Sequence, residues 1–148
     1  MLKIAHRGNL YGADKEYENH PEYLWSAIKS GYDVEIDLWS IRGNFYFGHD
    51  EPTYPIDPVL MFQMAKNGWF HCKNFEALSI LSKNFKFCNF FWHQEDDFTL
   101  TNNGYIWTYP GKEVGPQSIL VDIDLTSRVD YDMLYGICSD FVGLLERN

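Results

Sequence analysis

Cysteine is scarce in this sequence of 148 residues, and its arrangement argues against two classes of protein. The three cysteines, Cys72, Cys88 and Cys138, are odd in number and none of them forms a CxxC pair. A disulfide framework or a zinc site is therefore not expected. Each cysteine lies in an apolar run, where buried free thiols are common.

Long hydrophobic runs are also missing. No apolar stretch approaches the roughly 18 residues that a membrane-spanning helix needs. The N-terminal residues MLKIAHRG enter a strand-like pattern directly, without the layout of a signal peptide. We therefore expect a cytoplasmic protein with no transmembrane segment.

Positive charge is scarce as well. The 12 Lys and Arg residues face 21 Asp and Glu residues, which gives a formal net charge of −9. Such a field repels nucleic acid and anionic membranes unless a local basic patch or a metal reverses it. No run of Lys or Arg supplies such a patch, so we expect no nucleic-acid partner. Acidic groups could still surround a bound cation.

Apolar and aromatic side chains are abundant, at 45% and 18% of the residues, which is enough to build a core. With no linker or repeat, residues 1–148 are expected to form one domain. Strand-like runs alternate with segments of helical periodicity. The strand-like runs are 2–6, 32–39, 44–50, 68–73, 87–93, 104–109, 118–123 and 136–141. The helical segments are 20–31, 57–68, 74–84 and 129–136.

The alternation of strand and helix predicts an α/β fold, in which a parallel sheet has helices outside it. A full (β/α)8 barrel takes about 250 residues, and this chain has 148. We therefore predict a reduced TIM-type (β/α) barrel of about seven mostly parallel strands, with some helices shortened to loops. An open sheet is the alternative.

Two carboxylates late in the second predicted strand indicate a metal site. In the run VEIDLW, a period of two places Glu35 and Asp37 on one face and apolar residues on the other. Like charges at this spacing raise each other's pKa unless a cation lies between them. A hard divalent ion coordinated by oxygen atoms would satisfy both.

Two histidines follow strand ends near these carboxylates. His6 ends the first predicted strand, just before Arg7, and His49 follows the run NFYFG. Side chains at the carboxyl ends of parallel strands meet at the mouth of a barrel. Two imidazoles suit phosphodiester cleavage, since one can take a proton from the nucleophile while the other gives one to the leaving oxygen. A metal and Arg7 would neutralise charge on the phosphoryl oxygens.

The stretches IAHRGN, ENHPEYLWSAIKSGYDVEIDLW and FYFGHDEP resemble the amino-terminal signature of the glycerophosphodiester phosphodiesterase family. This family belongs to the phosphatidylinositol-phospholipase-C-like barrel group. The resemblance implies a metal-dependent phosphodiester hydrolase acting on a small glycerophosphodiester-like substrate. It implies these roles: His6 and His49 as catalytic acid and base, Arg7 as a catalytic phosphate contact, Glu18 at the substrate mouth, and Glu35 and Asp37 as ligands for calcium or magnesium.

The resemblance is fainter further along the chain. The third strand of the family commonly carries Glu-x-Lys, and the run FHCKN places Lys73 at the phosphate-binding lysine but His71 at the metal-binding acid. The run YIWTY is similar to a late strand with a pocket tryptophan, which would make Trp107 a substrate contact. The run GICSDF is similar to the closing strand, with Asp140 in its Ser/Thr-Asp pair. Residues 77–103 match no part of the family pattern.

Three interpretations of His71 are open. It could ligate the metal through nitrogen, although calcium and magnesium prefer oxygen. It could instead hydrogen-bond Glu35 or Asp37, or be a satisfied core histidine.

The function is open in a similar way. The shortened fold and the histidine at position 71 leave room for a degenerate member of the family that binds a phosphorylated small molecule or sugar without turnover. A structural protein that kept the scaffold is a third alternative, and a homodimer is conceivable because an incomplete barrel has exposed edges.

Overall fold

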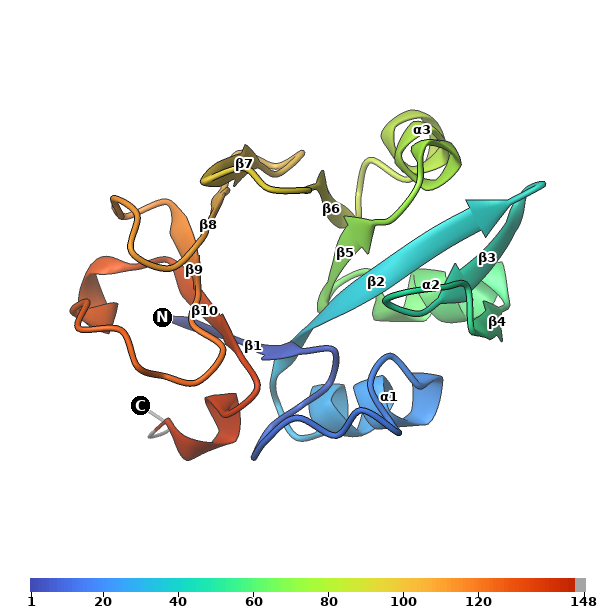
Figure 1. The fold of residues 1–148 in the computed structure, drawn as a ribbon. Helices are drawn as coiled ribbons and strands as arrows, with labels where there is room; N and C mark the ends of the chain where they lie inside the picture. Colours follow the sequence, from blue (N-terminus) through green and yellow to red (C-terminus); the bar gives the residue numbers. More distant parts are fainter. Residues whose placement is uncertain (146–148) are drawn as a thin grey trace.

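The computed structural model describes residues 1–145, which form one mixed sheet with three short α-helices outside it (Figure 1). The strands are β1 (Leu2–His6), β2 (Asp33–Ile41), β3 (Asn44–Phe47), β4 (Tyr54–Ile56), β5 (Gly68–Cys72), β6 (Asn89–Trp92), β7 (Phe98–Leu100), β8 (Ile106–Thr108), β9 (Ser118–Val121) and β10 (Gly136–Ser139). The helices are α1 (Pro21–Lys29), α2 (Pro58–Met64) and α3 (Phe75–Asn84).

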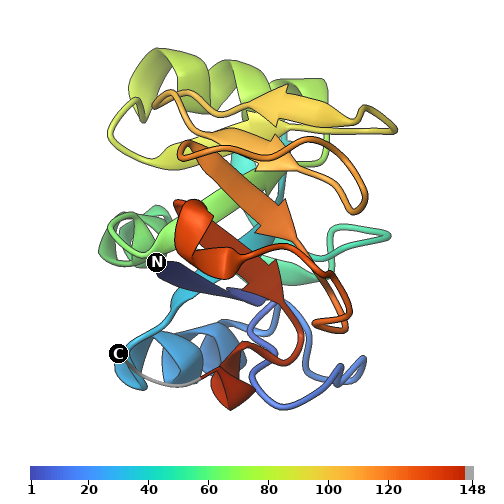
Figure 2. The same ribbon diagram turned by 90° about the vertical axis from the view of Figure 1, so that its left-hand side faces the viewer.

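The sheet curls into a half-barrel (Figures 1 and 2). Its order is β4-β3-β2-β1-β10-β9-β8-β7, and β5 pairs with both β2 and β6. Parallel pairing joins β1 to β2 and β10, β2 to β5, β5 to β6, and β9 to β8 and β10. The pairs β2–β3, β3–β4 and β7–β8 are antiparallel. The carboxyl ends of β1 and β5 therefore lie at one edge, beside the middle of β2, where the candidate site is found.

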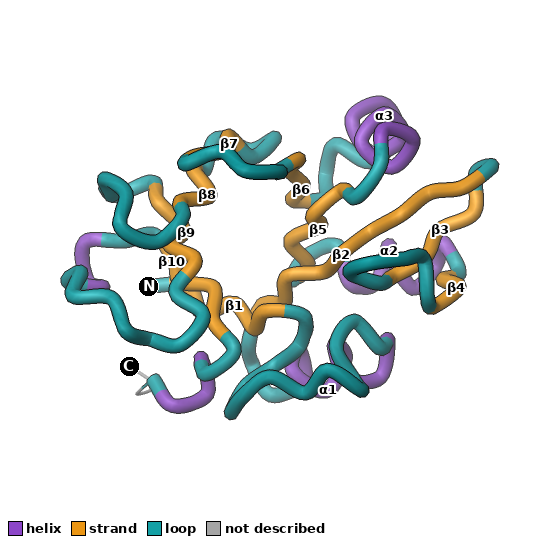
Figure 3. Tube along the Cα trace, in the orientation of Figure 1, coloured by secondary structure: helices purple, strands orange, loops and turns teal. Residues whose placement is uncertain are grey.

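The predicted TIM-type barrel is wrong. Among residues 1–145 the only α-helices are three short ones, all of which end by residue 84, and loops join the later strands (Figure 3). The connections after residue 92 are rich in turn-forming residues, as in Pro110-Gly111 and Gly115-Pro116, and they lack helical periodicity. The sequence thus predicted parallel pairing without showing that the crossovers from β8 to β9 and from β9 to β10 would lack an α-helix.

A few hydrogen bonds, most of them from the Asn102 side chain, join β6 to the segment of β7 in place of a strand ladder. The Asn102 amide donates hydrogen bonds to the carbonyls of Lys86 and Cys88, and its oxygen accepts one from the Phe90 N–H. Within the described chain, β6 pairs with no strand other than β5. One backbone hydrogen bond, from the Asn102 N–H to the Phe90 carbonyl, adds to these contacts, so the described sheet is not closed by a strand ladder at this point.

Three of the four predicted helical segments form α-helices. α1 begins at Pro21 with His20 as its N-cap, and α2 begins at Pro58 with Asp57 as its N-cap. Pro tolerates the first helical position because its missing N–H would have no partner there. The helix predicted over 129–136 is wrong, because only a 3-10 turn, η1 (Tyr131–Met133), forms there. The three-residue strands β4 and β7 were not predicted, since they are too short to show a period.

Two clusters of buried side chains divide the core. The larger one packs the outer face of the sheet against the helices, with Leu24, Met61 and Leu81 among its members. The smaller one lies on the inner face and includes Trp69 and Trp107. None of the helices in residues 1–145 is long and apolar enough to cross a membrane.

Candidate metal and phosphate site

The register of three parallel strands brings the predicted polar residues together. On β1 and β2, His6 is opposite Glu35, and on β2 and β5, Asp37 is opposite His71. Since side chains alternate along a strand, Glu35 and Asp37 share the inner face with His71. His6 lies beside one of the two carboxylates, with 4.0 Å between His6 Nε2 and Glu35 Oε2.

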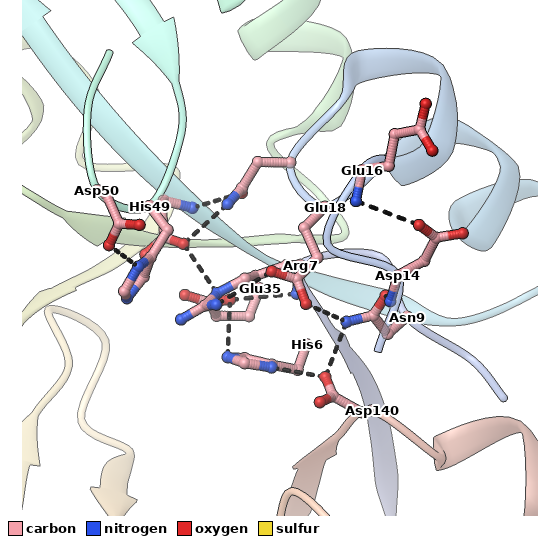
Figure 4. A network of polar contacts seen from close by, with 12 residues as sticks. His6, Arg7, Asn9, Asp14, Glu16, Glu18, Glu35, His49, Asp50 and Asp140 are labelled. Carbon is pink, nitrogen blue, oxygen red and sulfur yellow. Dashed lines mark hydrogen bonds and ion pairs between the residues drawn. The ribbon is translucent and has the colours of Figure 1, made fainter. Parts of the chain in front are cut away.

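A tight turn after β1 directs Arg7 into the site. Arg7 has a φ of 52° and Gly8 a φ of 91°, both in the left-handed region. A Cβ on Gly8 would lie 2.8 Å from Tyr23 Cδ1, so the position requires glycine for both its conformation and its space. The turn lets the Arg7 guanidinium reach Glu18 Oε2 at 3.1 Å, and the Arg7 backbone N–H donates to Glu35 Oε2 (Figure 4).

Glu35, Asp37 and His71 together could hold a metal ion. One ligand atom from each of them lies within 4.8 Å of the other two. Calcium ligands lie about 2.3–2.6 Å from the ion, so atoms on opposite sides of it are up to about 5 Å apart. Asp37 Oδ1 is buried without a hydrogen-bond partner, which is costly unless a cation approaches it. The residues present therefore fit a divalent cation.

His71 is oriented to present one nitrogen to the carboxylates. Its Nε2 lies 3.1 Å from the His93 carbonyl, which can only accept, so Nε2 carries the hydrogen. Nδ1 then faces Asp37 Oδ1 at 3.4 Å and Glu35 Oε1 at 3.6 Å. Burial opposes protonation, but the two carboxylates raise the pKa of His71 to about 9. Protonated His71 would thus compensate the carboxylates, and neutral His71 would offer Nδ1 as a ligand.

Three further side chains surround the Asp37 carboxylate. Arg7 Nε lies 3.1 Å from Asp37 Oδ2, although its N–H is not aligned for a hydrogen bond. The Lys73 ammonium lies 3.7 Å from Oδ1, and the Asn19 amide donates to Oδ2 at 2.8 Å. Burial would raise the pKa of Asp37, but the nearby His71 imidazole and the charges of Arg7 and Lys73 hold it well below its ordinary value. Asp37 is therefore a permanent anion near neutral pH.

His6 is held by a carboxylate from the far end of the chain. Its Nδ1 lies 2.7 Å from Asp140 Oδ1, just beyond β10, and the side chains are 16% and 7% exposed (Figure 4). Since a carboxylate only accepts, Nδ1 donates and Nε2 is free toward Glu35. Burial lowers the pKa of His6, but Asp140 and Glu35 raise it to a greater extent. His6 can therefore exchange a proton at Nε2.

His49 has a similar arrangement but is less enclosed. Its Nδ1 lies 2.7 Å from Asp50 Oδ1, which leaves Nε2 free. The His49 side chain is 42% exposed, and that of Asp50 is 93% exposed. This carboxylate is weaker support than Asp140, because solvent competes for both partners.

One cavity of about 660 Å³ is lined by both His6 and His49. Most of the predicted site residues line it, namely His6, Arg7, Glu35, His49, His71, Lys73 and Trp107. Asp37, which is fully buried, and Glu18 do not line it. Glu18 lies instead in an adjoining pocket of about 430 Å³ that shares Arg7 and His49 with the cavity.

Sequence reasoning missed residues that hold the site together. Asn9 is fully buried and donates to Glu18 Oε1 at 3.0 Å and Asp140 Oδ1 at 2.9 Å, so one amide links the partners of Arg7 and His6. Asn19 was not predicted as a site residue, yet its amide oxygen accepts a hydrogen bond from the Asp37 N–H. The N-terminal stretch IAHRGN contains Asn9, but no spacing rule indicates which carboxylates an amide will join.

Comparison of this chain with protein-family models, with curated proteins and with solved structures gave no match. The functional argument therefore depends on the geometry of the site and on the sequence motifs that form it.

Proposed function

We propose that this protein is a metal-dependent phosphodiester hydrolase of the glycerophosphodiester phosphodiesterase type. The observation that carries the proposal is one cavity that holds two histidines with free Nε2 atoms beside a group able to bind a divalent cation. This combination of groups suits proton transfer to and from the two oxygens of a phosphodiester.

The residues of the site would have two kinds of role, namely proton transfer and binding of the negatively charged phosphoryl oxygens. His6 and His49 would exchange protons at Nε2 with the attacking hydroxyl and the leaving oxygen. Arg7 and Lys73 would hold the phosphoryl oxygens, since both cations line the cavity and already lie beside Asp37. Asp140 would keep His6 in the tautomer that this role requires.

Glu35, Asp37 and His71 would bind the cofactor, a divalent cation that we expect to be calcium or magnesium. When bound, such an ion polarises a phosphoryl oxygen and offsets the charge that develops on it. The imidazole at position 71 would weaken calcium or magnesium binding relative to an all-oxygen site, because both ions prefer oxygen. A manganese ion should therefore be tested beside them, since imidazole suits transition metals.

The proposal is tested by hydrolysis of bis(p-nitrophenyl) phosphate and of glycerophosphocholine with calcium, magnesium or manganese. We expect metal-dependent turnover that falls by about 100-fold or more in His6→Ala, because general acid or base catalysis contributes about 10²–10⁴. Lys73→Ala should lower activity through the loss of a phosphate contact. Its matched control is Lys112→Ala, because Lys112 also pairs with an aspartate, Asp97 at 2.8 Å, but lies outside the cavity.

Turnover that is unchanged in His6→Ala, or that needs no metal, contradicts the proposal. Equal losses in Lys73→Ala and Lys112→Ala would also contradict the phosphate role of Lys73.

A second candidate function is binding of a phosphorylated small molecule or sugar without turnover. It is favoured by the charge balance at Asp37, where Arg7, His71 and Lys73 all lie within 4 Å of the carboxylate and compensate it without a metal. Under this alternative, phosphate esters bind and raise the melting temperature, yet no metal produces turnover.

A further inference from the structure

The candidate cavity has a second half that the proposed chemistry does not use. The polar half contains the histidines and cations that face the two carboxylates. The other half is lined mainly by apolar and aromatic side chains, namely Trp92, His93, Trp107, Tyr109, Pro110, Val121, Ile123 and Cys138. A phosphate and a glycerol would occupy only part of about 660 Å³, and pockets of this size usually enclose most of a larger ligand.

Alternation along two strands explains why the rings gather there. On β6 and just beyond it, Phe91 and His93 point to the inner face, and around β8 Trp107 and Tyr109 do the same. The rings form two stacked pairs. Phe91 and Trp107 stack with centroids 4.4 Å apart and planes 25° apart, and His93 and Tyr109 stack at 3.8 Å and 19°.

The two pairs differ in exposure. Phe91 and Trp107 are each 2% exposed and form a floor, whereas His93 and Tyr109 are partly exposed and form a wall above it. Of these four rings, His93 and Tyr109 have more exposed surface for a ligand, and flat rings add to such stacks by offset or edge contact. The wall also begins next to the site, because the His93 carbonyl accepts the hydrogen bond from His71 Nε2.

The charges around the cavity favour an uncharged group at this wall. Arg7, Lys73 and Glu35 belong to the polar half, and in the aromatic half the only formally charged lining residue is the exposed Glu95. A second phosphate would find no cation there. A quaternary ammonium group would find the two-ring wall rather than an aromatic cage closed around it.

We propose that the wall of His93 and Tyr109, above the floor of Trp107, binds an uncharged planar ring carried by one arm of the phosphate ester. This inference rests on the proposed phosphate site, and it narrows the substrate to esters with an aryl or a heteroaromatic arm.

The test is binding of four phosphate monoesters, measured by isothermal titration calorimetry on the whole protein with magnesium present. Phenyl phosphate carries a flat ring, cyclohexyl phosphate an apolar puckered ring, methyl phosphate no ring and phosphocholine a cationic arm. We expect phenyl phosphate to bind about tenfold more tightly than methyl phosphate and more tightly than the other two, a difference of about 1.4 kcal/mol.

Two substitutions at one position separate the ring from its hydroxyl. Tyr109→Phe keeps the stacking surface and should keep the preference for phenyl phosphate, whereas Tyr109→Ala should reduce it to the affinity for methyl phosphate. Tyr17→Ala is the matched control, because Tyr17 is 49% exposed and does not line the cavity.

The remaining outcomes of the titrations separate the ring site from the phosphate site. Equal affinity for phenyl and methyl phosphate, equal affinity for cyclohexyl phosphate, or tightest binding of phosphocholine would overturn it, while the phosphate site would survive. Absence of binding by every ester would overturn both proposals. Preferential binding of phenyl phosphate together with no hydrolysis of bis(p-nitrophenyl) phosphate would support the ring site and count against the catalytic proposal.

Discussion

Replacement of Asp140 by asparagine is the sharpest perturbation that the site offers. Asp140 Oδ1 accepts hydrogen bonds from both His6 Nδ1 at 2.7 Å and Asn9 Nδ2 at 2.9 Å. An asparagine oxygen at the same place can accept both bonds, so Asp140→Asn removes the negative charge while it preserves shape and packing. The variant therefore isolates the charge of this carboxylate.

The size of the effect follows from the change in hydrogen-bond type. A hydrogen bond to a charged group contributes about 1.5–3 kcal/mol and a neutral one about 0.5–1.5 kcal/mol, so the loss is about 1–2 kcal/mol. If this loss applies to the protonated His6 that forms during turnover, kcat falls by about 5- to 30-fold, at about 1.36 kcal/mol for each factor of ten. Asp140→Ala should be worse, because Asn9 and His6 both lose their acceptor.

The pKa of His6 should change in a defined direction. Burial lowers this pKa, and the hydrogen bond to Asp140 is the first of the effects that raise it, so Asp140→Asn should lower it. In the wild type, a folded-state pKa above the ordinary 6.5 stabilises the fold at low pH, and this stabilisation is lost as pH rises through the folded value. Asp140 itself has a lowered pKa, so its stabilisation is lost on acidification.

The wild type should therefore exceed Asp140→Asn in stability most clearly where both groups are charged, between about pH 4 and 6.5. NMR titration of the His6 imidazole and urea unfolding at several pH values measure these effects, and neither needs an active enzyme. The control is Asp97→Asn, an exposed aspartate outside the cavity. An unchanged pKa of His6 together with unchanged kcat would refute the reasoning.

Three further predictions concern metal, backbone and thiols. Magnesium or calcium at about 100 times its Kd should stabilise the wild type by about 2.7 kcal/mol. Glu35→Gln should abolish the resulting rise in melting temperature. An equal rise in the variant would exclude Glu35 as a ligand. Gly8→Ala should cost about 2 kcal/mol or more by urea unfolding, because of the positive φ and the close approach of Tyr23; an unchanged midpoint would contradict this. Burial raises the pKa of the Cys72 thiol to about 12 and that of the Cys88 thiol to about 11. Iodoacetamide at pH 8 should therefore alkylate these two thiols only after unfolding. Rapid alkylation of the native protein would show that they are not buried as described.

Much of the local structure could be predicted because it depends on neighbouring residues. Pro21 and Pro58 begin helices with a cap before each of them, and the period of two in VEIDLW placed Glu35 and Asp37 on one face. The error in fold class has a physical origin as well. Parallel pairing depends on distant strands, and the local pattern does not show whether the chain between them forms a helix or a loop.

In the candidate site, too, some features depend on local sequence and others on the pairing of distant strands. Residue identity, spacing and the family resemblance together selected His6, Glu35, Asp37 and Lys73 as candidates. The adjoining contacts depend on strand order. β10 lies beside β1, so Asp140 meets His6 across 134 residues of chain, and no sequence rule indicates that contact.

The sequence by itself determined which chemical groups this protein can use and on which face of each strand they lie, because those properties depend on residue type and on a local period. Only the tertiary structure decided which groups meet. The register of β1, β2 and β5 places His71, rather than a second imidazole such as His93, against the carboxylates of Glu35 and Asp37. The curl of the sheet turns the rings of β6 and β8 toward each other and forms the aromatic half of the cavity. Both outcomes depend on contacts between segments far apart in the chain, where hydrogen-bond register and packing outweigh local preference.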